Sequence, residues 1–102
     1  MNRSAGDVII LAEARAKPGK EAELAQALSE AAGPTRQQPG CVAFSLWQRP
    51  DLPATIMGFE RWASEADHQR HLGGAHIEKL MQRMADILAG APRIVAYRVL
   101  DE

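Results

Sequence analysis

The sequence contains little that would cross-link the chain or attract it to a charged partner. Its 102 residues include a single cysteine, Cys41, which excludes an intrachain disulfide and a zinc site built from cysteines. Twelve basic and thirteen acidic residues leave a net charge of -1, so no charge signal points to nucleic acid or to an anionic membrane. We therefore expect neither as a partner.

Long apolar runs are also missing. None approaches the roughly 18 residues that a membrane-spanning helix requires, and the small, polar residues 1–7 lack the apolar stretch of a signal peptide. We predict a disordered segment over residues 1–7 and one domain over residues 8–102. With the single cysteine, these absences predict a cytoplasmic protein.

The residues that are present predict an alternation of strands and helices. Apolar residues spaced three and four apart indicate two helices, the first from Glu21 and the second from about Ser64. Gly33-Pro34 should end or kink the first helix, and Gly73-Gly74 should break or bend the second. Apolar and alternating runs predict strands over residues 8–17, 41–48, 55–62 and 93–100.

This order favours a ferredoxin-like βαββαβ fold of the α+β class, a four-stranded antiparallel sheet with both helices on one face. The strands around residues 8–11 and 41–47 carry apolar side chains on both faces. The face without helices would then expose a larger apolar patch than soluble monomers usually tolerate. We expect a homodimer in which two open sheet faces pack together.

A candidate site lies between Phe59 and Ile77, which hold all three histidines and one of the two tryptophans. His68 and His71 share one helix face. A metal site with His76 as third ligand is one interpretation, but no Asp or Glu is obviously placed to complete it. A structural role for His71 is another. The third is an imidazole that takes a proton from a phenol, for which a pKa of about 6.5 is suited.

Five motifs occur in a characteristic order and carry a family resemblance. They are Lys17-Pro18-Gly19-Lys20, Gln38-Pro39-Gly40-Cys41, Phe59-Glu60-Arg61-Trp62, His71-Leu72 and Ala75-His76-Ile77. In them the sequence resembles the antibiotic biosynthesis monooxygenase family, small dimeric α+β-barrel proteins of the quinol-monooxygenase type. The resemblance covers about residues 8–100 and implies the same fold as the patterning.

The resemblance implies a cofactor-independent monooxygenase that oxidises a small phenolic, quinol or anthrone-like aromatic compound with dioxygen. The substrate anion would itself supply the electron to dioxygen, so no cofactor and no metal is expected. Because the family is functionally mixed, two alternatives stay open. One is an isomerase or another small-metabolite enzyme that uses the same histidines, and the other is a non-catalytic dimeric protein that binds a hydrophobic ligand.

The resemblance also suggests roles for individual residues. Haem-degrading members require an asparagine and a histidine where this sequence has Ala14 and Met81, which disfavours haem degradation. In the monooxygenase interpretation His71 is the base or hydrogen-bond partner of the substrate, and His76 assists it. The other residues expected to contact substrate in an apolar pocket between helices and sheet are Ala14, Phe44, Met57, Trp62, His68 and Met81.

Overall fold

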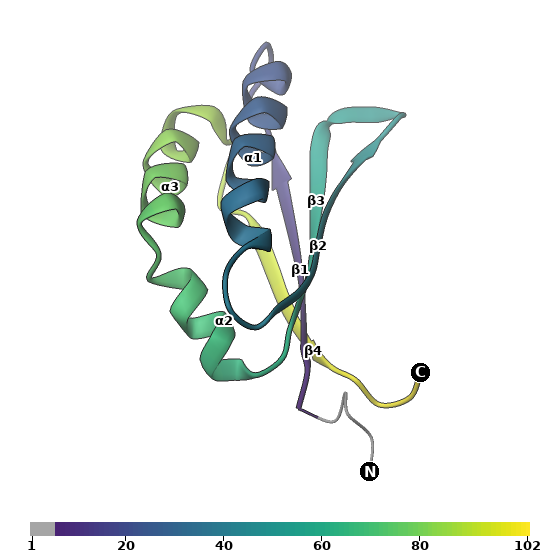
Figure 1. Ribbon diagram of the computed structural model, residues 1–102. Helices are drawn as coiled ribbons and strands as arrows, with labels where there is room; N and C mark the ends of the chain where they lie inside the picture. Colours follow the sequence, from purple (N-terminus) through teal and green to yellow (C-terminus); the bar gives the residue numbers. More distant parts are fainter. Residues whose placement is uncertain (1–5) are drawn as a thin grey trace.

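In the computed structural model, which describes residues 6–102, a four-stranded antiparallel sheet carries three helices on one face (Figure 1). The strand order β2-β3-β1-β4 confirms the predicted ferredoxin-like α+β fold. The elements are β1 (Val8–Arg15), α1 (Glu21–Arg36), β2 (Cys41–Arg49), β3 (Leu52–Trp62), α2 (Glu65–Leu72), α3 (Ala75–Ile87) and β4 (Arg93–Arg98).

Alternation along the strands separates a helix-covered face from an open face. On β3, the even-numbered residues Ile56, Glu60 and Trp62 are buried beneath the helices, and the odd-numbered residues point to the other side. The register places Ala14 of β1 opposite Ile56, so both strands present the same face to the helices. The main core lies there and consists of Ala14, Ala16, Leu24, Ala27, Ile56, Met84 and Ile87.

Asp7 belongs to the packed structure, although the sequence predicts disorder through residue 7. Its carboxylate is buried and accepts a 2.7 Å hydrogen bond from Nε of Arg61, which also pairs with Glu102 at 3.0 Å. This ion pair holds the start of β1 against β3. The rest of the predicted disordered segment, except Gly6, lies outside the described residues.

Helix α1 continues through Gly33-Pro34 to Arg36, so of the predicted end or kink at this point, the end is wrong. Proline cannot donate a backbone hydrogen bond, but the next residue compensates. Thr35 is fully buried, and its hydroxyl donates to the carbonyl of Ala31 at 2.8 Å, which adds a bond within the same turn. Burial of Thr35 against the rest of the fold thus keeps the last turn helical.

The second predicted helix is divided into α2 and α3 by Gly73-Gly74, as expected. Ser64 caps α2, because its hydroxyl accepts the backbone N–H of Asp67 at 3.1 Å. A Cβ on Gly74 would lie 3.1 Å from the carbonyl oxygen of His71 and 3.3 Å from the ring of His76. Glycine therefore lets the two helices meet at a tight corner.

The hairpin between β2 and β3 is shorter than predicted. Arg49 lies opposite Leu52 in the strand register, which leaves only Pro50 and Asp51 in the turn. The Arg49 guanidinium also forms a 2.6 Å salt bridge with the Asp51 carboxylate. Strand β4 ends at Arg98, two residues before the predicted limit. None of the helices within residues 6–102 is long and apolar enough to cross a membrane.

Truncation of the core should have a large effect on stability. Leu24 is 0% exposed at the centre of the core, so Leu24→Ala should lower the free energy of unfolding by about 2–5 kcal/mol. Urea denaturation measures this change. Leu100→Ala, at a position that is almost fully exposed, is the control and should change the free energy by less than about 0.5 kcal/mol.

Candidate functional site

A cavity of about 120 Å³ lies between the sheet and the three helices. All four strands contribute to its lining, and its walls are almost entirely apolar. A cavity on the order of 150 Å³ can hold a benzene ring, so this volume suits a small ligand. Its apolar lining residues include Ala12, Ala14, Leu28, Phe44, Leu46, Ile56, Leu80, Met81 and Met84.

Only three polar side chains are among the cavity-lining residues that the structure describes. They are Thr35 from the last turn of α1, Glu60 from β3 and His71 from α2. None of the described residues that line the cavity is lysine or arginine. The cavity therefore offers carboxylate, hydroxyl and imidazole groups to a ligand and no fixed positive charge.

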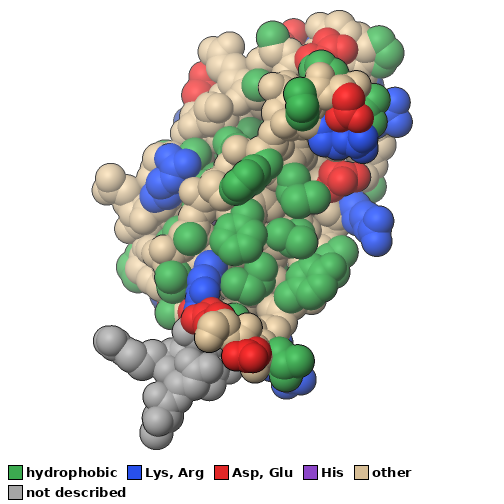
Figure 2. Space-filling view, turned by 90° about the vertical axis from the view of Figure 1, so that its right-hand side faces the viewer, with side chains coloured by type: hydrophobic (Ala, Val, Ile, Leu, Met, Phe, Trp, Pro, Cys, Tyr) green, Lys and Arg blue, Asp and Glu red, His purple; other side chains and the backbone are tan. Residues whose placement is uncertain are grey.

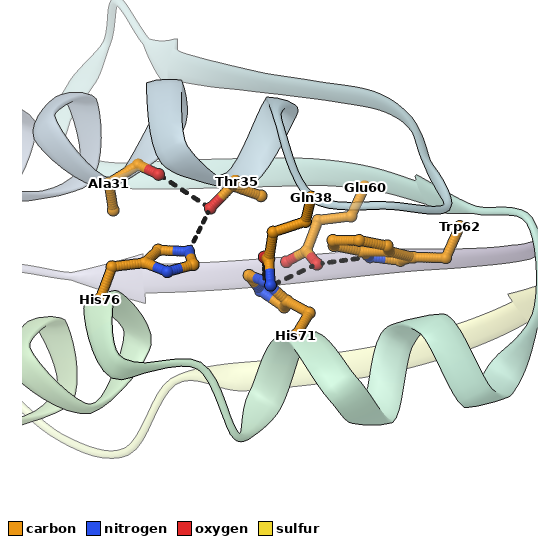
Figure 3. A network of polar contacts seen from close by, with 7 residues as sticks. All are labelled: Ala31, Thr35, Gln38, Glu60, Trp62, His71 and His76. Carbon is orange, nitrogen blue, oxygen red and sulfur yellow. Dashed lines mark hydrogen bonds and ion pairs between the residues drawn. The ribbon is translucent and has the colours of Figure 1, made fainter.

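His71 is held on both sides of its ring (Figure 3). Its side chain is buried, with the residue 4% exposed. Nδ1 lies 2.6 Å from Oε1 of Gln38, and Nε2 lies 3.7 Å from Oε1 of Glu60. The indole of Trp62 packs against the imidazole, with ring centroids 4.6 Å apart. These contacts fix the orientation of the ring at the edge of the cavity.

Glu60 is a buried carboxyl group, 9% exposed, and it accepts a 2.9 Å hydrogen bond from the indole N–H of Trp62. Burial raises its pKa, because the charged form loses water, and the bond from Trp62 opposes that rise. Trp62 lies two residues along the same strand and shares its face. β3 thus supplies both the acid and the donor that orients it.

Burial lowers the pKa of His71 most, and charge repulsion from the nearby His76 and His68 adds to this effect, so that the pKa is about 4. The ordinary histidine pKa assumed from the sequence is therefore wrong for this residue. Glu60 and His71 lie within ion-pair distance, yet burial favours the neutral form of each. At neutral pH, His71 consequently keeps a lone pair that can accept a proton.

His76 contacts two residues that line the cavity. Its Nε2 lies 3.1 Å from the Thr35 hydroxyl (Figure 3), and its ring centroid lies 5.8 Å from that of His71. The ring itself lines a surface groove between α1 and α3 instead of the cavity. The predicted assistance of His76 would therefore act through Thr35 or through the charge that His76 places near His71.

The structure brings part of the predicted site together. His71, Ala14, Phe44 and Met81 line the cavity. Met57 lies on the open face of the sheet, because it alternates with the cavity-lining residues Ile56 and Gly58. The remaining predicted residues, Trp62, His68 and His76, are not among the residues that line the cavity.

The His68 ring lies tilted beside Trp62, with ring centroids 6.2 Å apart, and it lines a separate surface hollow beside β4. Burial lowers the pKa of His68. Among residues 6–102, no group of three or more His, Cys, Asp or Glu side chains is arranged to hold a metal ion. The three histidine rings instead form part of a row of packed rings with Trp62.

Three residues of the site were not singled out as site residues from the sequence. Glu60 carries a usable signal, since alternation along the strand places it on the same face as Trp62. Thr35 lies four residues after the apolar Ala31, but the expected helix end at Pro34 obscured its position on the buried face. Gln38 lies in a turn, where no periodicity indicates which way a side chain points.

The rim of the cavity is formed by apolar side chains that are partly open to solvent. Leu72 at the end of α2, Met81 on α3 and Ile94 on β4 line the cavity and are all exposed. This rim is the route by which a small apolar ligand would enter.

The fold and the site define a small ferredoxin-like α+β protein with an apolar cavity and one buried acid–imidazole pair. A family model described as antibiotic biosynthesis monooxygenase matches residues 7–83. The chain belongs to this family.

Individual relatives have diverged in sequence. The uncharacterized protein sll1783 of Synechocystis is 24% identical, over 97% of this chain and 68% of its own length. The solved structure of NE2512, a protein of unknown function from Nitrosomonas europaea, is 29% identical with a TM-score of 0.86, covering 97% of this chain and 94% of that one.

Two further solved structures are evidence for the fold alone, given their low identity. Rv0793 of Mycobacterium tuberculosis is 24% identical with a TM-score of 0.90, covering 95% of this chain and 98% of its own. A protein of Nitrosomonas europaea with the provisional name antibiotic biosynthesis monooxygenase is 21% identical with a TM-score of 0.90. The match covers 98% of this chain and 96% of that one.

The lowered pKa of His71 predicts how the stability of the protein depends on pH. Because the folded protein binds this proton less tightly than the unfolded chain, His71 should reduce stability as the pH falls from about 6.5 to about 4. The loss should reach about 3 kcal/mol, at about 1.4 kcal/mol per pKa unit. NMR titration of the imidazole should give a midpoint near pH 4, and denaturation across this range gives the free energy.

Glu60 acts with the opposite sign, since its raised pKa favours the folded state as the pH falls. Comparing the pH dependence of the free energy of unfolding between the wild type and His71→Gln separates the effect of His71 from that of Glu60. A His71 midpoint near pH 6.5, or no difference in pH dependence between the two proteins, would contradict the assignment.

Proposed function

We propose that the protein is a cofactor-independent monooxygenase that oxidises a small phenolic or quinol-like aromatic compound with dioxygen. The observation that carries this proposal is the buried Glu60–His71 pair at the edge of an otherwise apolar cavity. The cavity volume favours a single ring over a fused three-ring anthrone. Family membership supports the reaction class, although the family fold alone does not fix an activity.

The first step is removal of the phenolic proton. A phenol with a pKa of about 10 transfers its proton to Nε2 of His71, which is unprotonated at neutral pH. The resulting phenolate lies beside an imidazolium, and opposite charges raise the pKa of that imidazole while the substrate anion is present. Glu60, 3.7 Å away, stabilises the same imidazolium when it is ionised.

The apolar walls serve the second step. A phenolate in water is stabilised by hydration, whereas in a dry cavity it is paired only with the imidazolium and remains electron-rich. It can then donate an electron to dioxygen. For a hydroquinone, one oxygen atom enters the hydroxyquinone product and the other leaves as water, so the substrate supplies all four electrons.

Oxygen uptake tests the proposal. Single-ring hydroquinones should be consumed with one dioxygen each, and label from ¹⁸O₂ should appear in the product. Glu60→Gln and His71→Ala should lower the rate about 10²–10⁴-fold, because each weakens proton removal. Glu78→Gln, an exposed change on α3, is the matched control and should keep the rate.

Several results would count against this function. No uptake across a panel of hydroquinones and anthrones would exclude the monooxygenase and leave the isomerase or the binding protein. Undiminished turnover in His71→Ala would remove His71 as the base, whatever the reaction.

We also propose a homodimer formed through the open sheet face. Figure 2 shows that hydrophobic side chains cover much of this face, with charges mainly toward its margins. Trp47 on β2 is 64% exposed there, and Tyr97 on β4 is 52% exposed. Such a patch is larger than soluble monomers usually expose. A second copy of the same face would cover it with matching apolar surface.

Solution mass tests the dimer. Light scattering at micromolar concentration should give twice the mass of the 11.1 kDa chain. Trp47→Glu should shift the protein toward the monomer, because it would bury an unpaired charge in the interface. Gln82→Glu adds the same charge to the exposed surface of α3 and should leave the mass unchanged. A wild-type monomer under these conditions would contradict the proposal.

A further inference from the structure

Gln38 determines which nitrogen of His71 carries the proton. Its Oε1 lies 2.6 Å from Nδ1 and can only accept, so Nδ1–H donates and the neutral ring leaves Nε2 with a lone pair. The 3.7 Å between Nε2 and Glu60 is too long for a hydrogen bond, which fits a nitrogen without a hydrogen. Gln38 itself does not line the cavity.

Thr35 has no hydrogen to offer the cavity either. Its hydroxyl donates to the carbonyl of Ala31 at 2.8 Å, so its oxygen accepts from Nε2–H of His76 at 3.1 Å (Figure 3). A hydroxyl has one hydrogen and two lone pairs. One lone pair on Thr35 therefore remains for a ligand.

Glu60 completes the set. The indole N–H of Trp62 occupies one position on Oε1 at 2.9 Å, and an ionised carboxylate has only acceptor sites left. When Glu60 is ionised, all three polar groups that line the cavity thus present acceptors. Thr35 and His71 do so whatever the protonation state of Glu60.

We propose that Gln38 is a specificity-determining positioning residue, which holds His71 as an acceptor so that the cavity selects neutral ligands bearing O–H donors. A ligand of the same shape without these hydrogens, such as a methyl ether, leaves the buried acceptors unpaired and is rejected. Anionic ligands are rejected because no lysine or arginine lines the described cavity. The aromatic ligand class rests on the proposed function; the donor selectivity does not require turnover.

Binding without oxygen tests this selectivity apart from the reaction. Calorimetric titration of the anaerobic protein should show tighter binding of hydroquinone than of 1,4-dimethoxybenzene. Gln38→Leu removes the acceptor for Nδ1–H and should reduce this preference about tenfold, the effect of one hydrogen bond. Gln38→Glu keeps an acceptor oxygen and should preserve it. Gln37→Leu, at the exposed neighbouring position, is the matched control.

The tautomer gives a second readout that a purely structural role would not move. Long-range ¹H–¹⁵N NMR spectra should show the proton of His71 on Nδ1 in the wild type and in Gln37→Leu. In Gln38→Leu the proton should redistribute toward Nε2 while the fold, followed by the amide spectrum, is retained. Gln38→Glu should keep the proton on Nδ1.

The proposal is overturned by a wild-type His71 protonated on Nε2, by equal binding of the two compounds, or by no binding of hydroquinone. Equal effects of Gln37→Leu and Gln38→Leu would also overturn it. If selectivity and tautomer are as expected but no oxygen is consumed, the proposed reaction fails while this inference stands. If oxygen is consumed but the protein does not prefer hydroquinone over 1,4-dimethoxybenzene, this inference fails while the proposed reaction stands.

Discussion

The site depends on placing the Glu60 carboxyl group inside the protein. Among residues 6–102, no lysine or arginine makes a hydrogen bond or ion pair with Glu60, whose contacts there are the Trp62 indole and the His71 ring. Burying such a group costs free energy unless it is hydrogen-bonded or neutral. The fold meets that condition with one N–H from the same strand and one proton-accepting ring from α2. Apart from Thr35, the other cavity-lining residues that the structure describes have no polar side chain.

That constraint explains why the rings gather where they do. Trp62 holds Glu60, His71 packs on Trp62, and Gln38 fixes the other side of His71. The first contact lies within β3, the second joins β3 to α2, and the third joins α2 to the turn after α1, 33 residues away in the sequence. A histidine exposed to water would keep its ordinary pKa. His71 has a lowered pKa because several elements enclose it.

Local chemistry made much of the fold predictable from the sequence. The cap at Ser64, the break at Gly73-Gly74 and the alternation of β3 all act within a few residues, and the structure has each of them. The continuation of α1 past Pro34 was not predictable, because it depends on burial of Thr35 against distant elements. The same reason applies to Gln38, which meets His71 across 33 residues of sequence, and to the low pKa of that ring.

The break between α2 and α3 divides the cavity into two kinds of surface. The acid–imidazole pair comes from β3 and α2, whereas Leu80, Met81 and Met84 on α3 form much of the apolar wall. Because the two helices are joined by glycines and not by a continuous hydrogen-bond ladder, their residues can diverge separately. Substitution of the α3 side chains can therefore reshape the apolar wall for ligands of another shape while the Glu60–His71 pair on β3 and α2 stays in place.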